Sequence, residues 1–223
     1  IFRKNDIRGF LTAKGELKGK ITDPDISINF NLDYPHFKGI RIREIWEGNI
    51  KNENNEFLLN MKNRYSPIPS FLSINFNSDL KINNANFIRV FNSNKGTIGI
   101  VKEDDGYNWR ADNFPLDELE LSIDKNQFDR IDGIINGKGS ISSDQSYLDG
   151  RIAWSLGKYG NINLANSLFD FRVKDNSFYI DSSLYPIDGG IIEVEYDSSK
   201  NNLINSEFKD ISTSWTILTA FRS

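Results

Sequence analysis

The sequence predicts an all-β protein built from one extended antiparallel sheet. Short runs in which apolar and polar residues alternate recur along most of the chain, and this period of two is typical of half-buried strands. The runs are separated by Gly, Asn, Asp and Pro, which favour tight turns. We therefore expect on the order of 14 to 18 strands and at most one or two short helices.

The clearest strand begins at Ile26, where every second residue is apolar and the residues between them, such as Ser27 and Asn29, are polar. The same alternation recurs in four further runs. Because alternate side chains of a strand point to opposite faces, each run predicts one apolar and one solvated face. The apolar face is expected to be formed by Ile26, Ile28, Phe30, Leu32, Leu72, Ile74, Phe76, Phe169, Phe171, Val173, Phe178, Ile180, Leu184, Ile192, Val194 and Tyr196.

Weaker patterns fill most of the remaining chain. Further strands are predicted at residues 40–50, 57–61, 98–101, 107–110, 131–141 and 148–156. The pairs Asp105-Gly106, Asn136-Gly137 and Asp188-Gly189 are typical of hairpin turns. Two short helical segments are expected, one turn at residues 116–119 after Pro115 and a helix over residues 215–221.

Composition excludes several classes of protein. The net charge of the 223 residues is −4 and the basic residues form no run, whereas nucleic-acid binding requires clustered Lys and Arg. No stretch approaches the roughly 20 apolar residues of a membrane-spanning helix. The absence of Cys excludes disulfides and zinc-thiolate sites. The chain begins with Ile and ends within a predicted helix, so we expect it to be a piece of a longer protein.

Catalytic patterns are not found. His36 is the only histidine, so neither a Cys-His pair nor a multi-histidine metal site can be built. Ser140 and Ser142 lack the second glycine of a nucleophile elbow. Gly137 and Gly139 lack the third glycine and the following helix of a dinucleotide site. We predict a protein that is not an enzyme, with no catalytic residues, no metal and no cofactor.

Residues 103–109 suggest two hypotheses about a binding site, one for calcium and one for a sugar. The acidic run at residues 103–105 offers oxygen ligands to calcium but is also typical of a charged hairpin turn, which we favour. Asp105 near Tyr107 and Trp109 suggests a glycosidase or a sugar-binding module, but nothing in the sequence fixes the separation of two carboxylates.

An internal repeat connects distant parts of the chain. Gly and aliphatic residues alternate in residues 15–26 (GELKGKITDPDI), 131–141 (IDGIINGKGSI) and, more faintly, 148–152 (LDGRI). A repeated strand unit is typical of a stacked sheet. We therefore treat residues 1–223 as one segment with a weak repeat at 9–50 and 128–156.

This repeated pattern of Gly and aliphatic residues resembles the repeats of the TamB proteins of the AsmA-like superfamily. The likeness is carried by residues 15–26, 39–43 (GIRIR), 113–119 (NFPLDEL) and 189–194 (GGIIEV). Residues 46–48 (WEG) and 143–146 (SDQS) are closer to the cyanobacterial and plastid branch.

The resemblance implies a curled sheet, a half-pipe or β-taco, with an open hydrophobic groove lined by the sixteen apolar residues. It further implies a bridge between membranes that carries phospholipid acyl chains and supports outer-membrane biogenesis and protein translocation. Such a bridge is membrane-associated, anchored in the inner membrane and placed in the periplasm or the plastid intermembrane space. Its partner, through parts outside this chain, would be an outer-membrane assembly or import β-barrel.

Alternation alone, without the resemblance, favours a different architecture. An apolar face needs only to be covered, and in most soluble proteins a second sheet covers it in a sandwich or barrel core. The alternative prediction is therefore a closed, non-catalytic β-sandwich or scaffold, whose exposed edges bind a partner strand.

Overall fold

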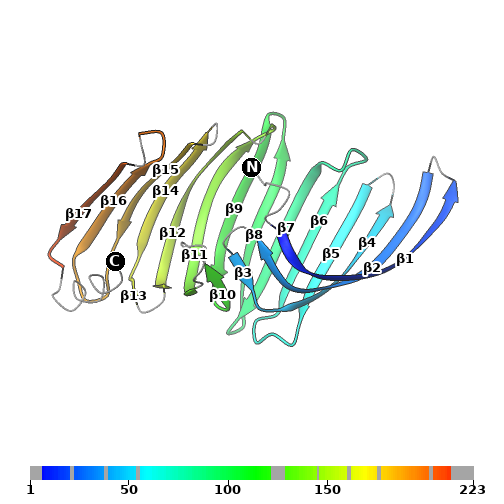
Figure 1. Ribbon diagram of the computed structural model, residues 1–223, viewed down its shortest axis with the longest axis horizontal. Coiled ribbons are helices and arrows are strands. Elements are labelled where there is room, and N and C mark those ends of the chain that lie inside the picture. The colour runs from blue at the N-terminus through cyan, green and yellow to red at the C-terminus, as the bar shows by residue number, and fades with distance from the viewer. Residues whose placement is uncertain are drawn as a thin grey trace.

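The computed structural model is all-β, as the sequence predicts, and Figure 1 shows its strands side by side in one elongated sheet. It describes residues 7–20, 23–37, 40–53, 56–121, 129–144, 146–159, 162–174, 177–200 and 203–211. None of these residues lies in a helix. The expected turn at 116–119 is a single hydrogen-bonded turn from Leu119 N to Leu116 O, and the expected helix at 215–221 lies outside the described residues.

Seventeen strands make up the sheet, within the range predicted. They are β1 (Ile7–Lys20), β2 (Asp23–Phe37), β3 (Ile40–Ile42), β4 (Ile45–Glu53), β5 (Glu56–Arg64), β6 (Ser70–Phe76), β7 (Ile82–Phe91), β8 (Asn94–Glu103), β9 (Gly106–Pro115), β10 (Leu119–Leu121), β11 (Asp129–Ser142), β12 (Tyr147–Tyr159), β13 (Ile162–Asn163), β14 (Ser167–Lys174), β15 (Ser177–Leu184), β16 (Ile191–Asp197) and β17 (Leu203–Lys209).

The fourteen longer strands form an antiparallel meander in which each pairs with the next along the chain. The short strands β3, β10 and β13 lie in connections between these strands. The connections that hold them all lie along one rim of the sheet, where β2, β9 and β12 end. We call this the closed rim.

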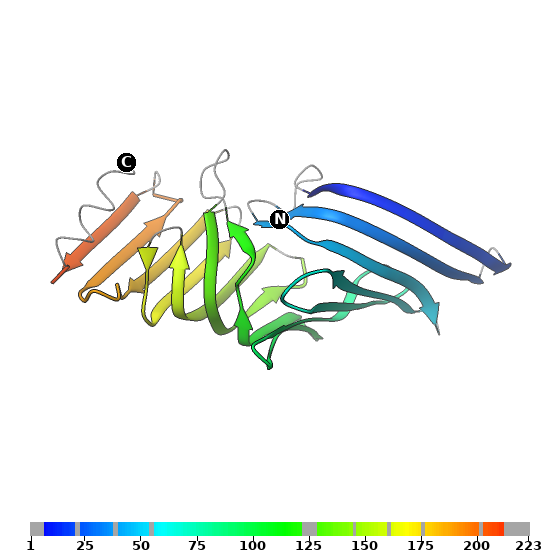
Figure 2. The same ribbon diagram turned by 90° about the horizontal axis from the view of Figure 1, so that it is seen from below.

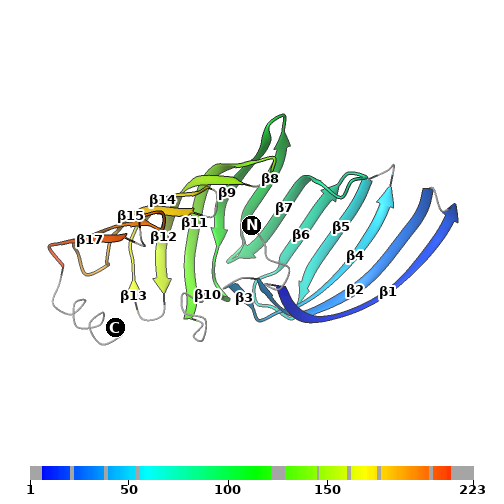
Figure 3. The same cartoon turned by 45° about the horizontal axis from the view of Figure 1, so that its top comes forward.

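Part of the meander is closed into a ring at this rim. The strand β3 pairs with β2, β10 pairs with β11, and β3 and β10 pair with each other. Through the main sheet β2 and β11 are seven strand-to-strand steps apart, but through β3 and β10 they are only three. The sheet between them must therefore bend, and Figures 2 and 3 show the bent strip from two further directions. Ion pairs from Arg41 and Arg43 to Glu120 join the two short strands.

The buried side chains gather at the closed rim. Rings of Trp46 on β4 and Phe87 on β7 lie 5.9 Å apart, although three steps of about 4.8 Å separate these strands along a flat sheet. The apolar face is therefore the inner face of the bend. The buried hydrophobic residues lie in the last part of a strand, the first part of a strand or a connection at this rim: Trp46, Ile68, Ala111, Phe114, Leu119, Ile131, Leu164 and Ile192.

Away from the rim the fold is open. A compact monomer of this mass exposes about 10,400 Å², whereas the accessible surface here is 14770 Å². The described strands all belong to one sheet, and no second sheet packs on them. The closed sandwich is therefore wrong for the part of the chain that the structure describes.

Arg89 is the most buried charged residue at the closed rim, with 1% of its surface exposed. Its Nη1 donates to Pro115 O at 2.9 Å, its Nη2 to Asp117 O at 2.7 Å and its Nε to Ser70 Oγ at 3.3 Å. Glu44 lies 3.9 Å away and is itself buried. Burial lowers the pKa of Arg89, and the Glu44 carboxylate opposes that shift. Arg89 thus ties β7 to the chain that leads into β10.

Two local expectations were wrong. The predicted strand at 40–50 is divided at Arg43 and Glu44, because Glu44 turns into the buried rim, where it accepts a hydrogen bond from Ser66 Oγ at 2.7 Å. The Asn136-Gly137 pair does not form a hairpin turn. It lies within β11, opposite Ala153 and Ile152. Glycine is needed at position 137 for close strand packing, because a Cβ there would lie 2.7 Å from Arg151 O.

Replacing Arg89 tests whether this network holds the rim. We expect Arg89→Leu to lower the free energy of unfolding by about 3–5 kcal/mol, because Glu44 becomes an uncompensated buried charge. The double variant with Glu44→Leu should lose less. Arg110→Leu removes an exposed ion pair and should cost at most about 1 kcal/mol. Urea unfolding measures all three, and equal losses for Arg89→Leu and Arg110→Leu would contradict this role.

A second prediction concerns the turn after β11. Asp144 accepts hydrogen bonds from Ser142 Oγ, Ser146 N and Ser146 Oγ, which lower its pKa to about 2. Because the folded pKa lies below the unfolded value of about 3.9, this stabilisation is present above the unfolded value and is lost as the pH falls towards 2. Asp144→Asn should therefore lower the melting temperature near neutral pH, and its difference from the parent should shrink in acid. A difference that does not change with pH would argue against it.

Candidate functional site

The register places all sixteen predicted apolar residues on one face of the sheet. Directly paired residues of antiparallel strands share a face. Ile28 pairs with Ile50, and the pairing continues through Leu59 and Ile74 across the bend. On the other side of the bend Phe171 pairs with Ile180.

One row of this face crosses fourteen strands without interruption, and we call it the apolar lane. It is formed by Gly15, Ile28, Ile50, Leu59, Ile74, Ala85, Ile100, Trp109, Gly139, Gly150, Phe171, Ile180, Tyr196 and Ile204. Its thirteen steps of about 4.8 Å give a path of roughly 62 Å. The sixteen predicted residues include five of these fourteen. The other nine were missed because glycine and alanine give no apolar signal and because the alternation is weak in the remaining strands.

Burial of the sixteen predicted residues separates an open face from a dry core. Ile192 is buried, and the other fifteen are only half-buried. An apolar side chain that remains partly exposed leaves surface that a ligand can remove from water. Their assignment as the lining of a lipid groove remains a prediction.

Trp109 lies across the middle of the apolar lane. A Cβ added at Gly150 would come within 2.1 Å of Trp109 Cζ2, and one at Gly139 within 2.5 Å of its Nε1. The indole donates to Asp149 O at 3.0 Å and stacks on Phe171, with ring centroids 5.9 Å apart. The two glycines therefore let the ring lie flat on β11 and β12, so that the lane stays shallow.

Trp154 repeats this arrangement nearer the closed rim. Its Nε1 donates to Asp132 O at 3.0 Å, and its ring would meet a Cβ at Gly133 or Gly157. On β4, Gly48 makes room in the same way for Phe30. The sequence gives no signal for these positions, because a glycine is seen to lie opposite an aromatic residue only when the strand register is known.

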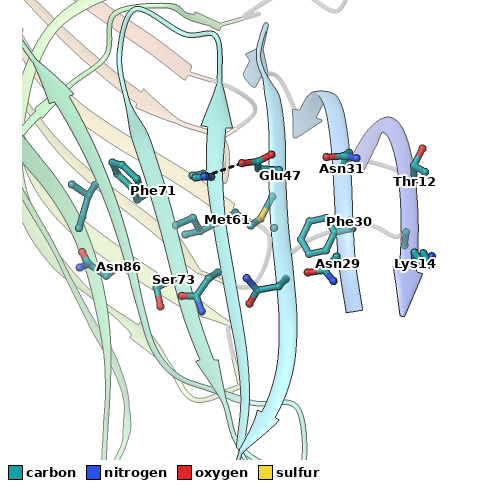
Figure 4. Close-up of a pocket in the computed structure, with 17 residues that line it drawn as sticks. Thr12, Lys14, Asn29, Phe30, Asn31, Glu47, Met61, Phe71, Ser73 and Asn86 are labelled. Carbon is teal, nitrogen blue, oxygen red and sulfur yellow. Dashed lines mark ion pairs between the residues drawn. The ribbon is translucent and has the colours of Figure 1, made fainter. Parts of the chain in front are cut away.

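The opposite, polar face carries a hollow of about 580 Å³ over β1 to β7, which we call the amide hollow. Figure 4 shows its side chains in two rows on successive strands. One row is Thr12, Asn31, Glu47, Lys62, Phe71 and Ile88, and the other is Lys14, Asn29, Asn49, Asn60, Ser73 and Asn86. Between the rows the floor is backbone, because the side chains there point to the apolar face. Lys62 Nζ and Glu47 Oε1 form an ion pair at 2.9 Å.

A second hollow of about 660 Å³ lies on the polar face beyond the bend. Arg110, Lys138 and Arg151 pair directly there, and such like charges on neighbouring strands repel. Two ion pairs offset this, Arg110 with Asp112 at 2.7 Å and Arg151 with Asp170 at 2.7 Å. Hydrogen bonds to these carboxylates raise the pKa of both arginines.

His36, Ser140 and the acidic residues at 104 and 105 lie in strands and turns of the sheet. His36 lies at the end of β2, paired with Arg41 of β3. The Ser140 hydroxyl donates to Asp149 Oδ1 at 2.6 Å; burial raises the pKa of Asp149, but this bond and that from Ser140 N outweigh it and lower the value. Asp104 and Asp105 form the β8–β9 turn. In the described ranges no three metal-ligating side chains gather.

No family model, no curated protein and no solved structure matches this chain. None of the described segments is a helix long and apolar enough to cross a membrane. The resemblance to TamB proteins therefore rests on the repeated sequence pattern alone.

Glycine substitutions test the flat indole. We expect Gly150→Val to lower the free energy of unfolding by about 1–3 kcal/mol, because the new side chain displaces Trp109. Gly99→Ala is the matched control, since the only neighbour of its added Cβ is Ala85 O at 4.0 Å, and it should be neutral or slightly stabilising. Chemical unfolding and near-ultraviolet circular dichroism measure both. An unchanged tryptophan signal in Gly150→Val would exclude this packing.

Proposed function

We propose that this chain is a segment of a periplasmic bridge between membranes, whose apolar lane carries the acyl chains of phospholipids. The unbroken, half-exposed lane across fourteen strands is the observation that supports the proposal most. In the full protein the bridge would be anchored in the inner membrane and would serve outer-membrane biogenesis together with a β-barrel partner. The resemblance of the repeated sequence pattern to that of TamB proteins supports the same assignment.

The dimensions of the lane suit an acyl chain. The hydrocarbon core of a bilayer is about 30 Å thick, so one acyl chain spans about 15 Å, and the lane is roughly four times as long. A chain of about 16 carbons gains roughly 12 kcal/mol on leaving water, at about 0.8 kcal/mol for each methylene. A continuous lane offers a similar part of that gain at every position, so a chain can slide along it without a large barrier.

The shallow floor supports movement rather than fixed binding. Deep pockets would hold a chain at one place, whereas the lane crosses β11 and β12 at Gly139 and Gly150, where the flat Trp109 ring covers the backbone. Ala85 plays the same part between Ile74 and Ile100. Small residues thus lie between large ones at two places inside the lane, at Ala85 and at Gly139 with Gly150.

A second candidate function is supported by β1, which pairs with β2 alone among the described strands and so forms an edge of the described sheet. Along β1 the side chains from 8 to 19 are exposed, and Phe10, Leu11 and Leu17 are 77%, 66% and 73% exposed. Such an edge offers unpaired backbone groups to another strand. A scaffold that binds a partner strand at β1 by sheet extension is therefore the alternative.

Two substitutions on β14 test the lipid proposal. Phe171→Glu places a charge in the apolar lane, whereas Leu168→Glu places the same charge on the polar face, where Leu168 is 45% exposed. We expect both variants to fold. Only Phe171→Glu should reduce photo-crosslinking of phospholipid in the intact protein and quenching of Trp109 fluorescence by brominated acyl chains.

The outcomes separate the readings. A folded Phe171→Glu variant that binds brominated lipid as the parent does would remove Phe171 from the lipid path. If the parent itself binds no lipid, the scaffold becomes the better account. A Trp109→Phe variant identifies the quenched ring, because the other three tryptophans, Trp46, Trp154 and Trp215, remain in it.

A further inference from the structure

We infer that the amide hollow binds an extended, neutral oligosaccharide of β-linked sugar rings, on the face opposite the apolar lane. The inference goes beyond the proposed lipid path and does not depend on it. It rests on a row of free amides, the spacing of that row and one exposed aromatic ring.

The first observation is a ladder of side-chain amides. Asn29, Asn49 and Asn60 pair directly on three neighbouring strands, and the row continues through Ser73 to Asn86. None of these four asparagine side chains takes part in a hydrogen bond to another residue that the structure describes. Each amide therefore offers both a donor and an acceptor, the combination that matches a pair of sugar hydroxyls.

The second observation is the spacing. Neighbouring strands lie about 4.8 Å apart, which is close to the length of one sugar ring in an extended β-linked chain. An oligosaccharide lying across the strands would therefore meet one side chain of this row for each ring, an amide on four of the six strands. The hollow crosses six strands from Lys14 to Asn86, so the contacts would accumulate with the length of the oligosaccharide.

The third observation is Phe71 in the opposite row. It is 45% exposed on the polar face, next to Ile88, and both line the hollow. An exposed ring beside amides presents an apolar surface to the C–H face of a sugar, while the amides bind its hydroxyls. Glu47 forms ion pairs with Lys62 at 2.9 Å and with Arg64 at 3.5 Å, so these charges are engaged with one another. The row from Asn29 to Asn86 carries no charged side chain, which favours an uncharged ligand.

Calorimetric titration of the whole chain with a β-1,4-linked glucose hexamer tests the inference. We expect binding of the hexamer to be at least about tenfold tighter than binding of the dimer, because fewer amides reach the shorter ligand. The α-1,4-linked hexamer, which is curved, should also bind more weakly. Failure of the parent to bind the hexamer at millimolar concentration would overturn the inference.

Matched variants locate the site. Asn49→Ala combined with Asn60→Ala should weaken binding about tenfold or more, and Phe71→Ala should weaken it while Phe71→Tyr retains it. Asn84→Ala is the control, since Asn84 lies on the same face of β7, two residues from Asn86, but outside the hollow. Equal losses in Asn84→Ala and the double variant, or binding of an extended polypeptide in place of the hexamer, would reject the site. Quenching by brominated lipid should be unchanged in every variant.

Discussion

Direct pairing between antiparallel strands is the constraint on which the rest of this molecule depends. A slip of one residue between any two strands would send every later apolar side chain to the opposite face. The ladder has four register shifts, and the lane crosses none of them. Between Ala111 and Phe114 the strand β9 gains one residue relative to β11, so that both side chains still point inward. Near Gly133 the strand β12 gains one residue relative to β11. The lane is continuous because its residues pair directly on every strand, away from these bulges.

In a single-layer sheet few side chains are buried, because no second layer of described strands covers either face. The closed rim provides most of the burial that stabilises the fold. Long connections fold back there, and Arg89, Phe114 and Trp46 pack between them. Stability is therefore concentrated along one edge, while the apolar lane and the amide hollow lie beyond it. Substitutions on either face can then change binding without removing the contacts that hold the fold.

The sequence predicted the parts of this arrangement that are local. Alternation identified β2, β6 and β14 to β16, because each of these strands has large apolar residues at successive alternate positions. It failed where long-range contacts decide the structure. Glu44 breaks a predicted strand because Ser66 and Arg89 lie beside it in space. Neither the ring closure through β3 and β10 nor the burial of Arg89 has a local signal.

The candidate site was also only partly predictable, for a physical reason. Large residues that alternate mark one side of a lane, but their small partners on the neighbouring strand carry no pattern. Gly139 and Gly150 acquire meaning only when register sets them beneath Trp109. Likewise, a run of scattered asparagines reads as solvated surface until register aligns Asn29, Asn49 and Asn60 across three strands. In a sheet of this kind the residues of one row come from different strands, perpendicular to the chain direction. The composition of each face therefore follows from the strand pairing and not from the sequence order.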